Sequence, residues 1–156
     1  MAKYKRARQG WYRVVNTSKY RQPLDETMQS SRPGYVKYKS SLELKAMQFA
    51  DAHPAVEWWS VEPFCLHYIK PTDNKVHRYF PDFLLCQNGK LLLVEVKSSD
   101  ETKMPKKPHK LTERAKYHYN EALKTYWINQ AKWAAARKFC KEKNMYFCIL
   151  TELDLK

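Results

Sequence analysis

The sequence predicts an α/β domain in which helices flank a mixed sheet. Apolar residues recur at helical spacing from residue 40 to 53 and again from 125 to 143. Short runs rich in β-branched and aromatic residues lie between these segments and after the second one, and the pair Asn88-Gly89 between two of the runs is a strong signal for a hairpin. The expected order is helix, strand, strand, strand, helix and strand.

The first helix and the first strand have clear boundaries. The tetrapeptide Ser40-Ser-Leu-Glu43 matches a capping box, so the helix begins there, and it ends before Pro54. Pro63 divides the apolar stretch that follows, which places the regular strand at residues 64–69. A turn is expected at residues 71–74, which combine proline, threonine, aspartate and asparagine.

A hairpin, a second helix and a final strand complete the predicted fold. Apolar runs at residues 77–86 and 90–96 flank the Asn-Gly pair, so they are expected to pair as antiparallel strands. A helix is predicted from 125 to 143, where lysines gather at its end, with an additional helical piece at 113–124. Residues 145–150 then form a last buried strand.

The charge of the chain indicates a polyanionic partner. The sequence has 29 lysine and arginine residues against 16 aspartate and glutamate residues, a formal charge of +13 in 156 residues. Each phosphate that a basic protein neutralises releases counterions, so nucleic acid is the simplest partner. Three glycines are too few for a glycine-rich phosphate loop, which excludes the common ATPase and dehydrogenase designs.

Cysteine usage and hydropathy exclude further classes. Four cysteines are scattered singly, which indicates reduced core residues and argues against a zinc ribbon or a disulfide framework. No apolar run is long enough to cross a membrane, so a soluble protein of the cytoplasm is expected.

The basic residues gather in two segments. Residues 1–34 form a basic N-terminal arm whose aromatic residues either contact nucleic acid or a partner, or pack back on the domain. Residues 35–156 form one domain. Within it, residues 98–112 form a basic loop rich in lysine and proline.

The predicted hairpin brings two acids and a lysine together. With Asn88-Gly89 at the centre of a type I′ turn, Asp82 lies opposite Glu95, and their Cβ atoms are about 5 Å apart. Lys97 projects from the same face, because side chains alternate along a strand. Two carboxylates at this distance repel by roughly 3 kcal/mol at an effective dielectric constant of about 20. A Mg²⁺ ion between them would offset that repulsion, and Lys97 would then orient or activate water or neutralise developing charge.

Simpler interpretations of the same residues remain open at this stage. Asp82 could cap the start of a strand, and Glu95 and Lys97 could form an ion pair on an exposed edge. Pro81 could introduce a bulge that shifts the register by one residue.

The acids and the lysine also resemble a known motif. Pro81-Asp82 followed by Glu95-Val96-Lys97 is similar to the motif of the PD-(D/E)xK nuclease superfamily, whose core has the same element order. A longer resemblance covers residues 35–155, and it places the chain near the head completion nucleases of T4-type tailed phages, which are related to the TnsA endonuclease N-terminal domain. It implies a restriction-endonuclease-like αβββαβ core. Its segments are Tyr38-Lys-Ser-Ser-Leu-Glu43, Glu57-Trp58, His77-Arg-Tyr-Phe-Pro-Asp-Phe83, Leu93-Val-Glu-Val-Lys97, Asn129-Gln-Ala-Lys-Trp133 and Ile149-Leu-Thr-Glu152.

The resemblance assigns roles to individual residues. The expected catalytic residues are Glu43, Asp82, Glu95 and Lys97. The expected ligands of Mg²⁺, for which Mn²⁺ can substitute, are Glu43, Asp82, Glu95 and the Val96 carbonyl. Glu43 also has a structural interpretation, because the fourth residue of a capping box bonds back to the start of its helix.

Three further residues are expected to contact substrate. Arg78 has the parity of Asp82 along the predicted strand and could reach a phosphate. Gln130 and Lys132 on the second helix match positions that line the site in the relatives that the chain resembles.

The sequence and the resemblance together imply a Mg²⁺-dependent endonuclease of double-stranded DNA. It is expected to act in phage head completion after packaging, in the cytoplasm of the infected bacterium or in the virion, near head, portal or neck proteins. One alternative is a structural head or neck protein that binds DNA with an inactive nuclease fold. Another is a transposon or repair nuclease of the same fold.

Overall fold

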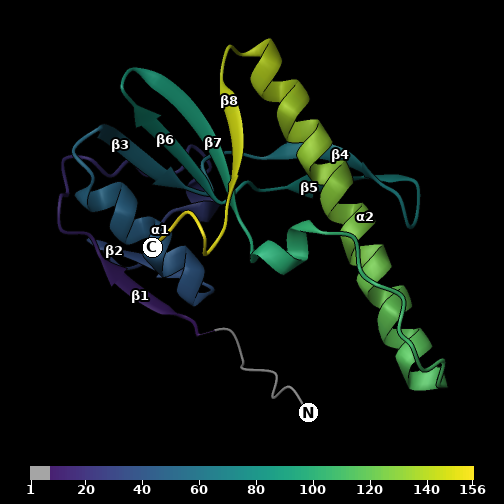
Figure 1. The fold of residues 1–156 in the computed structure, drawn as a ribbon. Helices are drawn as coiled ribbons and strands as arrows, with labels where there is room; N and C mark the ends of the chain where they lie inside the picture. Colours follow the sequence, from purple (N-terminus) through teal and green to yellow (C-terminus); the bar gives the residue numbers. More distant parts are fainter. Residues whose placement is uncertain (1–7) are drawn as a thin grey trace.

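A four-stranded mixed sheet forms the centre of the computed structural model, which describes residues 8–156 (Figure 1). The strand order is β3 (Val56–Val61), β6 (Phe83–Gln87), β7 (Lys90–Val96) and β8 (Tyr146–Leu150). The first three strands pair antiparallel, whereas β8 runs parallel to β7. The predicted mixed sheet is therefore confirmed.

Two helices cover opposite faces of this sheet. The first, α1 (Ser41–Ala52), begins where the capping box predicts, since the Ser40 hydroxyl accepts a hydrogen bond from the Glu43 amide at 3.1 Å. The second, α2 (Glu113–Glu142), is one continuous helix, so the additional piece expected at 113–124 is its N-terminal part. The element order α1, β3, β6, β7, α2, β8 is the predicted αβββαβ core.

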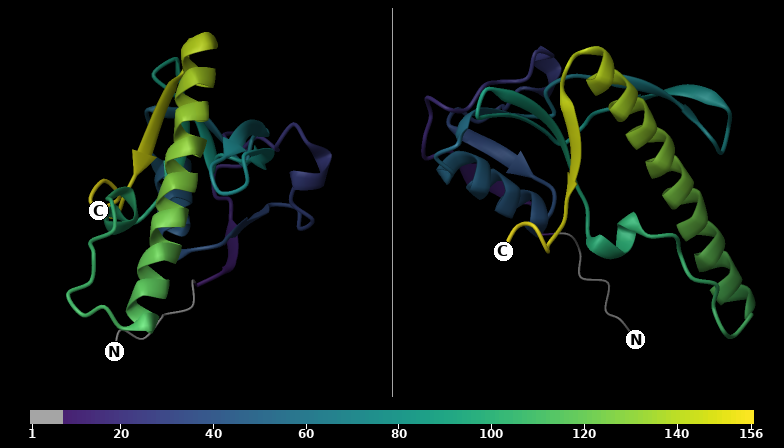
Figure 2. Two further views of the ribbon diagram at one scale, coloured as in Figure 1. Left: turned by 90° about the vertical axis from the view of Figure 1, so that its right-hand side faces the viewer. Right: turned by 45° about the horizontal axis from the view of Figure 1, so that its top comes forward.

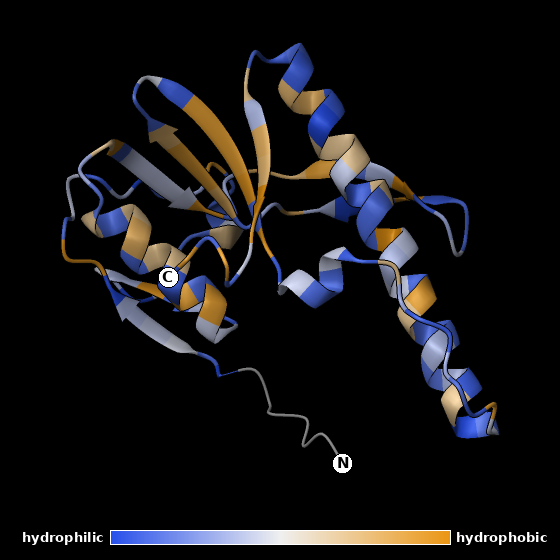
Figure 3. Ribbon diagram, in the orientation of Figure 1, coloured by the Kyte–Doolittle hydropathy of each residue, from blue (hydrophilic) through white to orange (hydrophobic). Residues whose placement is uncertain are grey.

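The strands of the hairpin separate two hydrophobic clusters. Because side chains alternate along β7, Val94 packs in the cluster that contains Met47 of α1, and Leu93 packs in the cluster that contains Ala136 of α2. Leu93 and Val94 are both almost fully buried. Figure 3 shows β6 and β7 as apolar along most of their length, as expected for strands covered on both faces.

The hairpin has the predicted turn and register. Asn88 and Gly89 have φ angles of 51° and 73°, as a type I′ turn requires. The pairs run from Gln87 with Lys90 to Phe83 with Val94, so the next pair outward is Asp82 and Glu95. Pro81 therefore does not shift the register of this hairpin.

The first strand of the core differs from the prediction. We expected it at residues 64–69, but the strand that pairs with β6 is β3. The later segment instead gives β4 (Leu66–Lys70), which pairs with β5 (Lys75–Tyr79) in a separate two-stranded ribbon around the predicted turn. The run expected at 77–86 is interrupted before β6, because Pro81 has no N–H to donate to a neighbouring strand.

The described part of the predicted N-terminal arm packs on the domain. Here β1 (Gly10–Arg13) pairs with β2 (Tyr35–Tyr38), and a short 3₁₀ helix, η1 (Glu26–Met28), lies between them. The buried carboxylate of Asp51 accepts hydrogen bonds from the Tyr12 hydroxyl and the amide of Val15, both at 2.7 Å, which ties this segment to the end of α1. The arm's first seven residues lie outside the described part of the chain.

The basic loop and α2 extend beyond the sheet. After a 3₁₀ helix, η2 (Ser99–Thr102), residues 103–112 run alongside the N-terminal half of α2, as both views of Figure 2 show. This half of the helix projects away from the strands and is largely hydrophilic (Figures 2 and 3). None of the described helices is long and apolar enough to cross a membrane.

Candidate active site

Asp82 and Glu95 face each other beside the α2 face of the sheet. Asp82 directly precedes β6, and Glu95 is the penultimate residue of β7. Glu95 has the parity of Leu93, which packs toward α2, and the hairpin register places Asp82 on the same face. The Asp82 Oδ2 atom accepts a hydrogen bond from the Val96 amide at 2.8 Å, which fixes the two strands at this point.

Burial and mutual repulsion disfavour the ionised form of this pair. Burial is the main cause that raises the pKa of Asp82 well above its usual range, and the charge of Glu95 raises it further. The Val96 amide opposes this shift only in part. Burial also raises the pKa of Glu95. A buried and a half-buried acid that repel each other in this way form a site suited to a cation.

Tyr79 orients Glu95, and no pattern in the sequence pointed to this residue. Its hydroxyl donates a hydrogen bond to Glu95 Oε2 at 2.6 Å, and its ring is buried. Trp133 of α2 also lies near Glu95, since its indole lowers the pKa of this carboxyl. The buried indole N–H makes no hydrogen bond of normal geometry. Both residues fall within segments of the family resemblance, but strand parity gave no signal for Tyr79 because the chain leaves β5 before Asp82.

Two lysines supply positive charge next to the acids. The charge of Lys97 lowers the pKa of both Asp82 and Glu95. The Lys132 ammonium lies 5.6 Å from the ring centre of Tyr79, and its charge also lowers the pKa of Glu95. Within residues 8–156, neither lysine forms an ion pair shorter than 4 Å with an acid. Both therefore keep their hydrogen-bond donors for another group.

Glu43 caps the start of α1 and lies near the acid pair. Its Oε2 atom accepts a hydrogen bond from the Lys39 amide at 2.9 Å, one residue further back than the capping box predicts. Its charge nevertheless raises the pKa of Asp82, which places it within electrostatic range. Burial lowers the pKa of Lys39, but the hydrogen bond with Glu62 and the charges of Glu62, Glu43 and Asp82 outweigh burial and raise it.

The other two residues expected to contact substrate are Arg78 and Gln130, which belong to different elements. Arg78 is exposed, and it points away from the face on which its neighbour Tyr79 reaches Glu95. Its charge instead lowers the pKa of Asp25. Gln130 is half-buried on α2, three residues before Trp133.

The donor set fits a hard divalent cation. The hydrogen bonds described above use Oδ2 of Asp82 and Oε2 of Glu95, which leaves Oδ1 and Oε1 on the two facing carboxylates. Oxygen ligands from one or two carboxylates, completed by water and substrate phosphate, are typical of Mg²⁺. In the part of the chain that the structure describes, no three acidic, histidine or cysteine side chains are already gathered as a metal cluster. Glu43, whose Oε1 is also free, is therefore not gathered with the two facing acids and would have to move toward them to become a third ligand.

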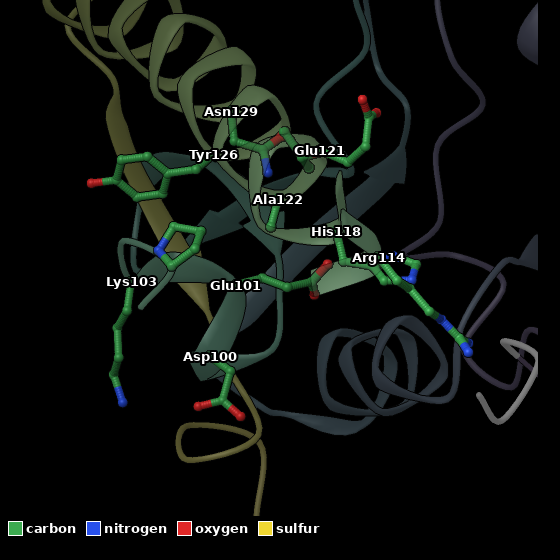
Figure 4. A pocket seen from close by; sticks show the side chains of 11 residues that line it. Asp100, Glu101, Lys103, Arg114, His118, Glu121, Ala122, Tyr126 and Asn129 are labelled. Atoms are coloured by element: carbon green, nitrogen blue, oxygen red, sulfur yellow. The ribbon is translucent and has the colours of Figure 1, made fainter. Parts of the chain in front are cut away.

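A separate cavity of about 670 Å³ opens between η2 and α2 (Figure 4). Its lining includes the buried Asn129, one turn of α2 before Trp133, but none of the predicted catalytic residues. Its wall combines acids such as Glu101 with cations such as Arg114 and Lys103. The chemistry of the acid pair therefore belongs to the sheet and not to this cavity.

The fold and the site define a class of protein. A mixed sheet between helices, with two acids and a lysine at the ends of neighbouring strands, is the arrangement of restriction-endonuclease-like nucleases. Residues 53–152 match the family described as TnsA-like endonuclease N terminal. The chain belongs to this family.

A curated relative supports the same assignment. The chain is 30% identical over 142 residues to the head completion nuclease of Enterobacteria phage T4, which covers 90% of this chain and 89% of the relative. The resemblance seen in the sequence is therefore confirmed.

Proposed function

We propose that this chain is a Mg²⁺-dependent endonuclease that hydrolyses phosphodiester bonds of double-stranded DNA during phage head completion, after packaging. The observation that carries the proposal is the pair formed by the half-buried Asp82 and the buried Glu95, two carboxylates that face each other with a lysine beside them. The T4 relative, which is named a head completion nuclease, supports the biological setting. The cytoplasm of the infected bacterium, or the virion, is the matching location.

In this proposal Asp82, Glu95 and the Val96 carbonyl would hold the ion, and Glu43 would join them through its free Oε1 atom. Mg²⁺, or Mn²⁺ in its place, supplies Lewis acidity and lowers the pKa of water at the site. Tyr79 keeps Glu95 in place through its 2.6 Å hydrogen bond.

The lysines act on the substrate. Lys97, on the face of both acids, orients the attacking water and stabilises the negative charge that develops at the phosphorus. Lys132 lies over the Tyr79 ring and binds a phosphate oxygen of the DNA strand that is cut. Gln130 and Arg78 contact the DNA further from the reacting phosphate. The formal charge of +13 favours the approach of DNA to this site.

Plasmid nicking tests the proposal. The wild-type protein should convert supercoiled plasmid to nicked and linear forms with Mg²⁺ or Mn²⁺ and not with EDTA. Asp82→Ala and Lys97→Ala should reduce the rate by at least 100-fold while DNA binding persists, because catalytic groups act on the transition state. Asp73→Ala removes an exposed acid of the β4–β5 turn and serves as the matched control. If the Asp82 and Lys97 variants cut as fast as the wild type, the proposal is wrong. Tight, salt-sensitive binding with no cleavage would indicate the structural DNA-binding role instead.

A further inference from the structure

The outer face of the β1–β2 ribbon combines an exposed aromatic ring with cations. Trp11, 40% exposed, pairs across the ribbon with the exposed Lys37. At the next pair, on the opposite face, Tyr38 lies over Gly10, and a Cβ atom at this glycine would come within 2.5 Å of the tyrosine hydroxyl, so the ring would have to shift. The Trp11 ring and the Lys37 ammonium therefore lie side by side on one exposed face of the ribbon.

A groove of about 220 Å³ lies between this ribbon and the segment around η1. It offers ring faces, ammonium groups and small hydrogen-bonding side chains in one place. The residues that line it include Trp11, Tyr20, Gln29, Ser30, Lys37 and Lys39. Tyr20 packs on the fully buried Trp59, with ring centres 4.8 Å apart, which positions this wall of the groove.

The groove ends beside the catalytic acids. Lys39 lines it with its side chain and donates its backbone amide to Glu43 at 2.9 Å. Glu62, also in its wall, pairs with the Lys39 ammonium and donates its amide to the Asp82 carbonyl at 2.8 Å. Glu62 has a φ of 44°, a conformation that favours glycine. Backbone strain of this kind is maintained at positions that a site requires.

We infer that this groove binds an unpaired stretch of a DNA strand next to the phosphate to be cut. The inference rests on the proposed nuclease function and adds a substrate class to it, namely duplex DNA with a single-stranded tail or a frayed end. Bases in a closed duplex stack on each other and cannot offer a free face to Trp11, whereas an unpaired base can. Lys37, which forms no ion pair among the described residues, is placed to meet a phosphate of such a strand.

Binding measurements in EDTA test this inference without any cleavage. Fluorescence anisotropy would compare the affinity of the full-length protein for a blunt duplex and for the same duplex with a single-stranded tail. We expect Trp11→Ala to lower the ratio of tailed to blunt affinity about tenfold, in line with the loss of one base–aromatic contact. Trp11→Phe should restore most of this ratio. Trp127→Ala, at an exposed tryptophan of α2, is the matched control and should leave it unchanged.

Tryptophan fluorescence supplies a second readout. Tailed DNA should quench the emission of the wild-type and Trp127→Ala proteins more than that of Trp11→Ala, and circular dichroism should show that all variants are folded. An unchanged affinity ratio in Trp11→Ala overturns the inference and leaves the ribbon available for a protein partner. If Trp11→Ala lowers the ratio of tailed to blunt affinity but the wild-type protein cleaves no DNA, the binding groove stands and the nuclease proposal is wrong. The two failures are therefore distinguishable.

Discussion

Glu95 is a buried carboxylate that faces another carboxylate and accepts a hydrogen bond from a buried tyrosine. Neither Lys97 nor Lys132 neutralises it by direct contact within the described residues, although both lower its pKa. A buried charge without a direct partner destabilises a fold, so this setting is costly to the protein alone. The acid pair therefore lowers the stability of the metal-free fold and provides the ligands for a cation.

The metal-free protein should therefore be stabilised by Asp82→Asn. The raised pKa of Asp82 means that the folded state holds a proton that the unfolded state releases from about pH 4 upward, so stability falls as the pH rises through this window. Asparagine removes the repulsion, on the order of 3 kcal/mol at most, and keeps an oxygen for the Val96 amide. Thermal unfolding in EDTA between pH 5 and 8 checks this, with Asp73→Asn as control. Equal pH slopes in wild type and Asp82→Asn would contradict it.

Tyr79→Phe should weaken the metal site while the fold persists. Removal of the hydroxyl frees Glu95 to rotate, and outer-shell partners of this kind are worth about 10- to 100-fold in metal affinity. The measurement is the Mg²⁺ concentration for half-maximal cleavage, with the melting temperature alongside. Tyr68→Phe is the control, because Tyr68 packs edge-to-face on Tyr79, and the hydroxyl that bonds Glu95 is that of Tyr79. An equal shift in both variants would show that Tyr79 acts only by packing.

At the scale of the element, the β6–β7 hairpin determines where the acids meet. Its turn could be predicted because Asn88 and Gly89 adopt positive φ angles for local reasons, and the register follows from the turn. Glu57 strengthens the turn, since its carboxylate accepts a hydrogen bond from the Gly89 amide at 2.9 Å. The sequence was therefore enough to predict that Asp82 lies opposite Glu95 and that Lys97 has the strand parity of Glu95.

Other parts of the site depend on contacts between distant elements. Tyr79 reaches Glu95 only because β5 belongs to a separate ribbon, and strand alternation cannot predict that. The continuous α2 was divided in the prediction because its N-terminal half lacks an apolar face, a consequence of its projection beyond the sheet. The first core strand was expected in the later apolar run, at residues 64–69, and not at β3, because both runs have strand composition.

Gly89→Ala should destabilise the hairpin through backbone strain alone. The φ of 73° is unfavourable for alanine, and no atom crowds the added Cβ, so we expect a cost of about 1–2 kcal/mol. Chemical denaturation measures this free energy of unfolding. Gly89→Asn should cost less, because asparagine tolerates this conformation. Indistinguishable stabilities for wild type and Gly89→Ala would disprove the turn assignment.

At the scale of the whole molecule, an acidic site lies within a strongly basic chain. The lysine-rich segment 103–112 and the projecting half of α2 extend well beyond the sheet (Figure 1). Such an extension suits contact with DNA phosphates at a distance from the reacting one, while the acids stay near the centre.

Replacing Lys106 and Lys107 by alanine should reduce the salt dependence of DNA binding. Each lost phosphate contact lowers the slope of log K against log salt concentration by about 0.9, so the double variant should lose about 1.8. Titrations of duplex DNA at several NaCl concentrations give this slope. Lys141 and Lys143, at the other end of α2, form the control pair. The prediction fails if the two double variants show the same slope.

The most direct test of the central claim is anomalous diffraction from crystals soaked in Mn²⁺. The proposal predicts a manganese peak between Asp82 and Glu95, with an oxygen of each carboxylate about 2.1 Å from the ion. The Asp82→Ala crystal should lose this peak. Manganese bound only elsewhere, in a protein that nicks plasmid under the same conditions, would contradict the account.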